Sequence, residues 1–145
     1  MKLCVFYEIP DTSRSQFEKT ENKADWYEIM GNYSLGENGL KQYTVDAQVS
    51  DFAESLSKQL RPMNLLFTGE LQTTIPADEP NVGFLGSKLV GEISDTLKAV
   101  EDDYFEGVAN QELLAPNGYN WLTVGLREFF AEVAAEENAM VCLWE

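Results

Sequence analysis

The sequence predicts one α+β domain, in which a small mixed sheet with the N- and C-terminal strands at its centre packs against four to five helices. Residues 3–9 alternate in side-chain character with the period of two that is typical of a strand. Residues 139–144 are apolar on both faces, as in a strand that is covered on both sides. Between these ends, apolar residues recur at helical spacing, and a chain of 145 residues suits a single domain.

The first third of the chain predicts a strand, a polar helical segment and a loop. The strand over residues 3–9 ends at Pro10, and Asp11 can begin a short helix after it. Over residues 15–30 the acids fall three or four positions apart, which on a helix places them on one solvated face. Glycine and asparagine recur between residues 31 and 39 and indicate a loop.

The middle of the chain predicts an amphipathic helix that begins near Thr44 and ends before Pro62. Its apolar residues repeat at steps of three and four: Val45, Val49, Phe52, Leu56 and Leu60. The apolar segment 64–69 fits either a strand or a helical turn. Residues 71–80 contain two prolines and indicate an irregular connection.

The second half of the chain predicts three helices and the last strand. Ser87 can cap a helix that runs to about residue 100, residues 103–114 form a shorter helix, and Asn120 can cap a third. The third helix carries an apolar stripe made by Leu122, Leu126, Phe129 and Val133. The segment 83–86, GFLG, could offer backbone N–H groups to an anion, although an ordinary helix-entry turn explains it more simply.

Acidic residues are in large excess, and the excess is greatest near the C-terminus. The chain has 25 acidic and 10 basic residues, a net charge of −15. Residues 99–145 hold ten acids and a single base, Arg127, a net charge of −9. This charge argues against direct binding to nucleic acid or to anionic membranes, and it would speed association with a basic protein. The simpler alternative is that the acids only keep the protein in solution.

The residues needed for the commonest catalytic sites are missing from the sequence. It contains no histidine, which removes the usual general base, the common nucleophile–histidine pairs and the usual zinc ligand. It contains no phosphate-binding glycine motif either. We therefore expect a protein that is not an enzyme and that binds no cofactor or metal. Paired carboxylates could still support glycosidase-type or metal chemistry, so an enzyme of that kind is an alternative.

The two cysteines, Cys4 and Cys142, lie in the first and last predicted strands. Their spacing matches neither a redox pair nor a metal site, so we expect buried thiols that act as small apolar side chains. If the two strands pair, the sulfurs could lie close together. No apolar segment reaches the roughly 20 residues that span a bilayer, and no secretory signal is recognisable. We therefore expect a cytoplasmic protein with reduced cysteines.

The acids near the C-terminus include the candidate partner-binding residues. Three glutamates recur every four residues along one edge of the last helix, where their repulsion costs about 0.2–0.5 kcal/mol per pair. A denser acidic cluster precedes them, and aromatic side chains within such a charged rim are typical of interface anchors. A merely solvated helix face is the alternative. The residues that we expect to contact a partner are Glu101, Asp102, Asp103, Tyr104, Glu106, Trp121, Glu128, Glu132 and Glu136.

Several segments resemble one bacterial family. Residues 58–69, KQLRPMNLLFTG, are similar to a segment that ends in a Leu-Leu-Thr-Gly-type motif, and GFLG at 83–86, the helix at 88–100 and the Leu-x-x-Phe-Phe helix within 119–145 follow in the same order. This order resembles YfbM-like proteins, a family of unknown function, over about residues 52–145. The sequence departs from the family at Asn64 and at Leu60-Arg61, where histidine and tryptophan are usual. The resemblance implies a relation to immunity proteins of bacterial toxin systems.

Charge and resemblance together predict an acidic cytoplasmic inhibitor or immunity-type protein, which binds and neutralises a toxin, a nuclease-like enzyme or another basic enzyme. Its acidic surface would steer the encounter and cover the basic site of the target. The alternative is a regulatory or housekeeping binding domain of YfbM-like type with an unknown ligand. A concave apolar pocket would favour that alternative, whereas a flat acidic face would favour the inhibitor.

Overall fold

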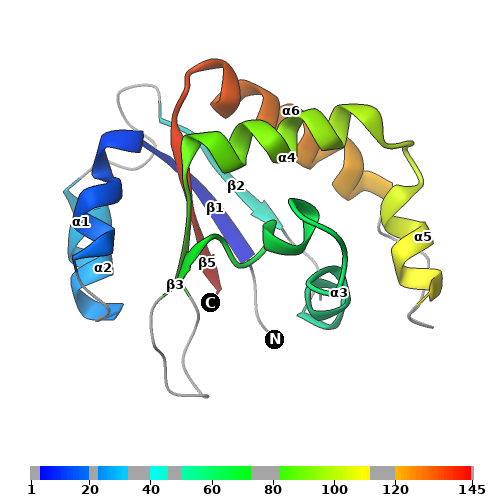
Figure 1. Ribbon diagram of the computed structural model, residues 1–145, viewed down its shortest axis with the longest axis horizontal. Coiled ribbons are helices and arrows are strands. Elements are labelled where there is room, and N and C mark those ends of the chain that lie inside the picture. The colour runs from blue at the N-terminus through cyan, green and yellow to red at the C-terminus, as the bar shows by residue number, and fades with distance from the viewer. Residues whose placement is uncertain are drawn as a thin grey trace.

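The computed structural model describes residues 4–19, 23–32, 40–45, 50–72, 82–111 and 120–144. Within these ranges, five strands form one sheet in the order β2-β1-β5-β4-β3 (Figure 1). The strands are β1 (Cys4–Ile9), β2 (Gln42–Val45), β3 (Leu71–Gln72), β4 (Val82–Leu85) and β5 (Ala139–Trp144).

The first and last strands lie at the centre of the sheet, which confirms that part of the prediction. β1 and β5 pair over their full lengths, from Cys4 opposite Trp144 to Ile9 opposite Ala139. All of β5 and nearly all of β1 are buried. Because a central strand with both faces covered needs apolar residues at every position, β5 shows no alternation in its sequence.

The sheet is antiparallel rather than mixed, which corrects one part of the predicted fold. The physical reason is the connection from β4 to β5. α4 (Ser87–Ala99) leaves the sheet at the end of β4, and α6 (Asn120–Ala135) returns to the same end before β5 (Figure 1). A single crossover helix would place β5 parallel to β4, whereas this pair of helices places it antiparallel.

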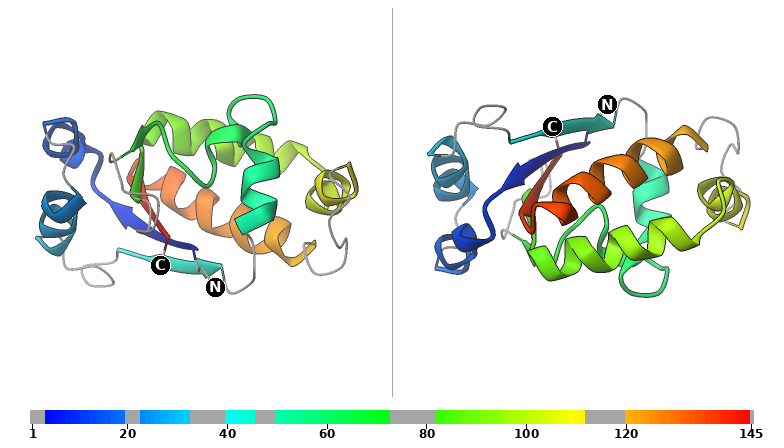
Figure 2. Two further views of the ribbon diagram at one scale, coloured as in Figure 1. Left: turned by 90° about the horizontal axis from the view of Figure 1, so that it is seen from below. Right: turned by 90° about the horizontal axis from the view of Figure 1, so that it is seen from above.

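Helices cover both faces of the sheet, so the α+β class is confirmed (Figure 2). α1 (Arg14–Glu18) and α2 (Lys23–Gly31) lie against one face, and α3 (Ser50–Leu56), α4, α5 (Tyr104–Gln111) and α6 lie on the other. The described residues thus form six α-helices instead of four to five, because the polar segment 15–30 makes two short helices. None of these described helices is both long enough and apolar enough to cross a bilayer.

Alternation along β1 divides the buried side chains into two cores. Cys4 and Phe6 face the larger core under α3 to α6, whereas Ile9 faces the smaller core under α1 and α2. In the smaller core, the Phe17 ring packs against the rings of Trp26 and Phe84, with centroids 4.8 and 5.0 Å apart. Buried residues of α5 and α6 belong to the larger core, so these two helices, next to which the acids gather, lie in the layer over it.

The middle of the chain differs from its prediction. Residues 42–45 pair with β1 as a strand instead of beginning a helix, and α3 begins only at Ser50. Phe52 and Leu56 are buried as the helical spacing predicts, but Leu60 is 88% exposed and lies beyond the helix, and Val49 lies outside the described residues. Pairing with β1 buries Val45 in the larger core, so tertiary contacts override the local helical pattern.

The structure also determines the conformation of residues 63–65 and 82–85. Residues 63–65 form a short 3₁₀ helix, which favours the helical turn over the strand. Residues 82–85 form β4, where the sequence indicated only a turn. Glycine is required at position 83 because a Cβ there would overlap the carbonyl oxygen of Thr68. Of the connection predicted over 71–80, the first two residues form β3 and the others lie outside the described residues.

The start of α4 is held by two acidic side chains from distant parts of the chain, and not by Ser87 as predicted. Gly86 is the N-cap residue. Asp11 Oδ1 accepts a hydrogen bond from the Ser87 N–H at 2.9 Å. Glu70 Oε1 accepts one from the Gly86 N–H at 3.0 Å and another from Arg14 Nη1 at 2.6 Å. Carboxylates suit this position because they bond unpaired N–H groups and interact favourably with the helix dipole.

Candidate functional site

The predicted partner-binding acids form two groups on neighbouring elements. Glu101, Asp102 and Asp103, which we term the α5 acids, immediately precede α5. Glu128, Glu132 and Glu136, which we term the α6 row, recur at every fourth position along α6 and just after its end. All six side chains are exposed. These six acids are therefore accessible to solvent, and their role in binding a partner stays a prediction.

Arg127 links the α5 acids to the end of α4. Its Nη1 donates to Asp102 Oδ1 at 2.9 Å, while Nε donates to the Leu97 carbonyl at 2.8 Å and Nη2 to the Val100 carbonyl at 3.0 Å. A cation that bonds the last carbonyls of a helix also interacts favourably with the negative end of its dipole. The single base of residues 99–145 therefore has a structural role, and it partly balances the charge of Asp102.

The α6 row lies beside the edge strand β2. Glu132 Oε2 forms an ion pair with Lys41 Nζ at 2.8 Å. The hydrogen bond to Glu132 raises the pKa of Lys41, and the charges of Glu8 and Glu136 act in the same direction. Among the described residues, Glu128 and Glu136 form no ion pair, so most of the negative charge of the row faces solvent.

The two acidic groups lie on opposite flanks of α6, whereas the sequence suggested one face. Arg127 faces α4, and Glu128, the next residue, is turned by about 100° toward β2. Val124, one turn before Glu128, is 50% exposed on the outer side of the helix. Because it lies four residues before Glu128, Val124 continues the α6 row by one turn and places an exposed apolar side chain beside the acids. Val124 lies outside the apolar stripe of α6, so the periodicity of the sequence does not single it out.

The other predicted contact residues are placed differently. Tyr104 is half-buried, its ring centroid lies 5.3 Å from that of Phe105, and it packs against the larger core. Burial raises the pKa of Tyr104. Glu106 is half-buried and takes part in an interaction. The side chain of Trp121, in the first turn of α6, lies outside the described residues. Tyr104 is therefore better suited to support α5 than to enter a pocket of a partner.

Tyr43 is an aromatic residue at the α6 row that the sequence analysis did not identify. It lies in β2, and its ring stacks on Phe129 with centroids 5.6 Å apart and planes at 29°. A Cβ at Gly125 would overlap the Tyr43 hydroxyl, so this glycine allows the ring to lie on α6. Burial raises the pKa of Tyr43, and the charge of Glu128 adds to this effect. Only the position of β2 beside α6 reveals this residue.

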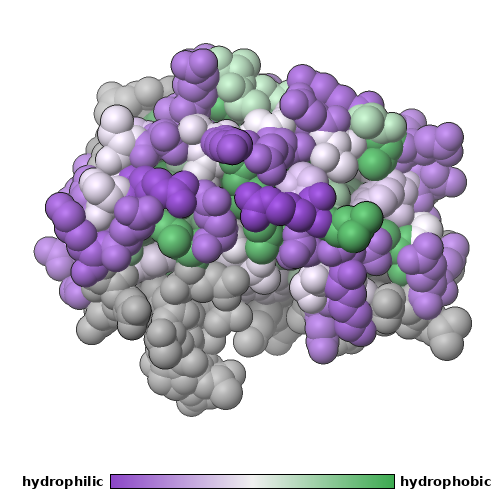
Figure 3. Space-filling view, viewed as in Figure 1, coloured by the Kyte–Doolittle hydropathy of each residue, from purple (hydrophilic) through white to green (hydrophobic). Residues whose placement is uncertain are grey.

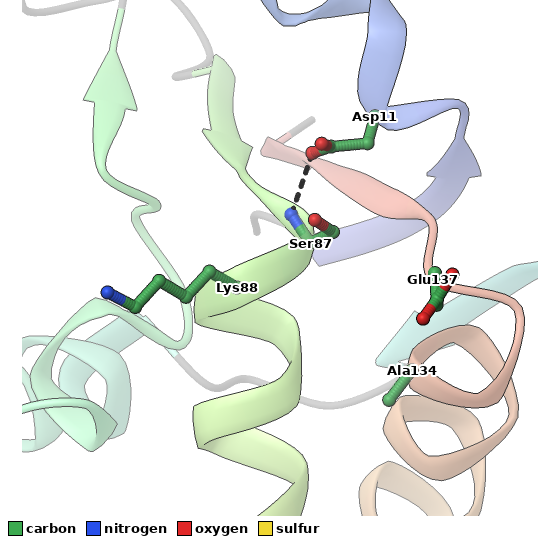
Figure 4. A pocket seen from close by; sticks show the side chains of 5 residues that line it. All are labelled: Asp11, Ser87, Lys88, Ala134 and Glu137. Carbon is green, nitrogen blue, oxygen red and sulfur yellow. Dashed lines mark hydrogen bonds between the residues drawn. The ribbon is translucent and has the colours of Figure 1, made fainter.

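A pocket of about 370 Å³ lies where α4 begins and α6 ends (Figure 4). It is lined by Asp11, Ser87, Lys88, Ala134 and Glu137. Asp11 points toward the backbone N–H of Ser87, whereas Lys88 extends away from the other lining residues (Figure 4). The N–H groups of Gly86 and Ser87 already bond the carboxylates of Glu70 and Asp11, so these two donors are not available to an anion.

The two thiols are buried and take no part in the acidic surface. Both cysteines are buried and reduced in the sheet. Within the described ranges, no three acidic or sulfur side chains come together as a metal site would require. Figure 3 shows that hydrophilic side chains dominate the face seen in Figure 1, and that hydrophobic ones are scattered among them. This face is thus better suited to polar recognition than to a large apolar contact.

The comparisons with known proteins identify the fold. No protein-family model and no curated protein matches the sequence. Among solved structures, the crystal structure of YfbM from Escherichia coli, described as a protein of unknown function, has a TM-score of 0.64 and covers 99% of this chain and 99% of that chain. The chain has a YfbM-like fold.

The YfbM-like resemblance predicted from residues 52–145 is confirmed at the level of the fold. The structural likeness also covers the first fifty residues, where the sequence shows no visible match. At 12% sequence identity, YfbM shows the fold and nothing about activity. The implied relation to immunity proteins gains no support from this likeness, so a function for the acidic surface has to be argued from the residues themselves.

Proposed function

We propose that this YfbM-like chain is an inhibitor or immunity-type protein, which binds a basic protein such as a toxin or a nuclease-like enzyme through the outer side of α6. The observation that carries the proposal is the exposed α6 row next to the half-exposed Val124. The chain would act by covering the basic site of its target. This proposal assigns it no catalytic activity.

The charge of the α6 row supports this role. Like charges four residues apart weaken an isolated helix by about 0.2–0.5 kcal/mol per pair. Lys41 relieves this repulsion only at Glu132. A basic partner would relieve the rest, and the net charge of −15 would speed the encounter at low salt.

The α5 acids extend the same surface on the other flank of α6. Asp102 is tied to Arg127, whereas Glu101 and Asp103 form no ion pair with any residue that the structure describes. A partner centred on Val124 could reach both acidic flanks. Standard interfaces bury about 800 Å² on each partner, which is more than one helix edge provides.

A second function is favoured by a different observation, the pocket at the start of α4. Its volume of about 370 Å³ lies at the lower end of the range that holds small ligands. The lining residues Asp11, Ser87, Lys88 and Glu137 would select a small polar molecule. In this alternative the chain is a regulatory or housekeeping binding domain, and the acids of α6 serve only solubility.

Capture of the partner tests the first function. The tagged chain would be incubated with lysate of the organism that encodes it, washed at rising salt and analysed by mass spectrometry. We expect a basic protein in equal amount that leaves the chain as salt increases. Repeated capture of background proteins alone would favour the small-ligand alternative.

A matched pair of variants makes this experiment specific to the surface. Glu128, Glu132 and Glu136 would be changed together to glutamine. In the control, the exposed acids Glu28, Glu54 and Asp95 on α2, α3 and α4 would be changed to their amides, which alters the net charge equally. We expect roughly tenfold slower association for the first variant and little change for the control. Equal loss in both variants would show that net charge alone attracts the partner.

A further inference from the structure

The edge strand β2 offers unpaired backbone groups next to the α6 row. Among the described strands, only β1 pairs with β2, which is the outermost strand on its side of the sheet (Figure 2). An edge strand exposes backbone donors and acceptors along its free side, where another extended chain can pair with it.

The register shows which groups of β2 are directed outward. The Glu8 N–H donates to the Lys41 carbonyl at 2.8 Å, so this pair lies at a hydrogen-bonded position of the β1–β2 ladder. Hydrogen-bonded and non-hydrogen-bonded pairs alternate along an antiparallel ladder. The backbone groups of Tyr43 and Val45 therefore point toward β1 and bond it. The N–H and C=O groups of Gln42 and Thr44 consequently point away from the sheet. No described residue bonds these outward groups.

The same edge is flanked by negative charge. Lys41, just before β2, forms the ion pair with Glu132, and Tyr43 lies against Phe129 one residue after Glu128. A strand added beside β2 would therefore run along the α6 row. Alternate side chains of that strand would point toward the layer of α6, within reach of its carboxylates.

We propose that the basic partner supplies an extended segment rich in lysine or arginine, which pairs with β2 as an additional strand while its basic side chains contact the α6 row. This proposal rests on the proposed function and specifies how the partner binds. Backbone bonds to Gln42 and Thr44 provide the docking, and the acids Glu128, Glu132 and Glu136 provide the selection for positive charge.

Charge argues against a second copy of this chain as the occupant. Pairing β2 with its own counterpart would bring two α6 rows toward each other in a chain of net charge −15. Like charges that meet at an interface oppose association. A basic segment removes this repulsion, so the edge favours a different protein.

Substitutions at Thr44 separate strand pairing from charge. Thr44→Pro removes the outward N–H and leaves the bonds of Tyr43 and Val45 to β1 in place, and proline is tolerated in edge strands. Thr44→Val keeps the N–H and serves as the control. The probe is an eight-residue peptide of alternating lysine and valine, with binding measured by fluorescence anisotropy at low salt. We expect Thr44→Pro to weaken binding about tenfold and Thr44→Val to change it little.

The outcomes distinguish this inference from the proposed function. Equal binding by Thr44→Pro and Thr44→Val would overturn strand pairing. If the captured natural partner is lost on changing the α6 row to glutamine but binds Thr44→Pro normally, the inhibitor function stands and only the β2 contact is wrong. If the row variant associates with that partner as fast as the wild type does, the proposed function through the α6 row is wrong.

Hydrogen exchange of the wild-type chain provides a measurement that does not depend on the folding of a variant. With saturating peptide, we expect the Gln42 and Thr44 amides to exchange at least about tenfold more slowly. Unchanged exchange at saturation, or no peptide binding at all, would overturn the proposal. Protection that rises with protein concentration in the absence of peptide would identify a second copy as the occupant and would overturn it as well.

Discussion

The sulfurs of Cys4 and Cys142 lie 3.3 Å apart where the first strand of the chain meets the last. Cys4 stands opposite Trp144 and Cys142 stands opposite Phe6, so the two thiols are diagonal neighbours on the side of the larger core. Cys142 Sγ donates to the Phe67 carbonyl at 3.1 Å, and Trp144 Nε1 donates to the same oxygen at 2.9 Å. The thiol pair therefore belongs to a buried network that connects β5 to the segment after α3.

Both thiols should be protected from reagents in the folded protein. Because Cys4 and Cys142 are fully buried, labelling requires the sheet to open. We expect a chromogenic disulfide reagent to react at least about a hundredfold more slowly in buffer than in denaturant. Fast labelling of one cysteine in buffer would show that β1 or β5 separates from the sheet without global unfolding.

Stability should fall in alkaline solution, and Cys4 should contribute to the loss. Burial, with a smaller effect of Cys142, raises the pKa of Cys4 well above 9.0. The contribution of Cys4 is complete below pH 9.0 and is lost above it, because only the unfolded chain then ionises this thiol. One such group changes the unfolding free energy by at most about 1.4 kcal/mol per pH unit.

Urea unfolding at pH 8 and at pH 10 checks this effect. In Cys4→Ala we expect a smaller fall in stability between the two values than in the wild type, whatever the cost of the substitution itself at pH 8. Some fall should remain in the variant, because burial also raises the pKa of Tyr43 and Tyr104. Equal falls in both proteins would mean that the Cys4 thiol does not titrate differently in the two states.

Two glycines should respond in opposite ways to alanine. At Gly83 the new methyl group would overlap the backbone of Thr68, so we expect a loss of about 1–3 kcal/mol. At Gly91, within α4, nothing lies within 4 Å of the new Cβ, and alanine should stabilise the helix by about 0.5–1 kcal/mol. Thermal unfolding of both variants measures the difference. If Gly83→Ala is as stable as the wild type, β4 and the backbone at Thr68 can move apart at little cost in unfolding free energy.

Asp11 should stabilise α4 from a distance of 76 residues in the sequence. Asp11→Ala removes the acceptor of the Ser87 N–H, and we expect a loss of about 0.5–2 kcal/mol, the usual effect of removing a helix cap. Asp95→Ala, an exposed acid in the same helix, is the control and should change stability by less than about 0.5 kcal/mol. Similar values for the two variants in urea titrations would contradict the capping role.

The buried carboxylate of Glu8 should hold the start of β2 in place. Its Oε1 accepts the Lys41 N–H, and its Oε2 accepts the Asn138 side-chain amide, both at 3.0 Å. Glu8→Gln keeps the shape but replaces one acceptor with a donor, so we expect a loss of about 1–3 kcal/mol. Exchange of the Lys41 amide should accelerate more than that of amides in β5. Unchanged exchange at Lys41 would show that β2 is held by its ladder bonds alone.

Much of the candidate surface could be predicted from the sequence, but its arrangement could not. The spacing of Glu128, Glu132 and Glu136 depends only on helical periodicity, and the structure shows these side chains exposed as expected. The partner of Glu132 is Lys41, ninety-one residues away, which no local pattern could indicate. The same reason explains why Tyr43 was missed, since its contact with Phe129 exists only because β2 lies beside α6.

The sequence by itself determined the α+β class, the three helices of the second half and the central position of the terminal strands. These features follow from the side-chain periodicity and apolar character of single segments, which local sequence records directly. The tertiary structure alone decided that residues 42–45 form a strand, that the sheet is antiparallel and that Asp11 caps α4. The physical reason is that each of these depends on contacts between segments far apart in the chain. Such contacts can override local preference, as the pairing of Val45 with Cys4 shows.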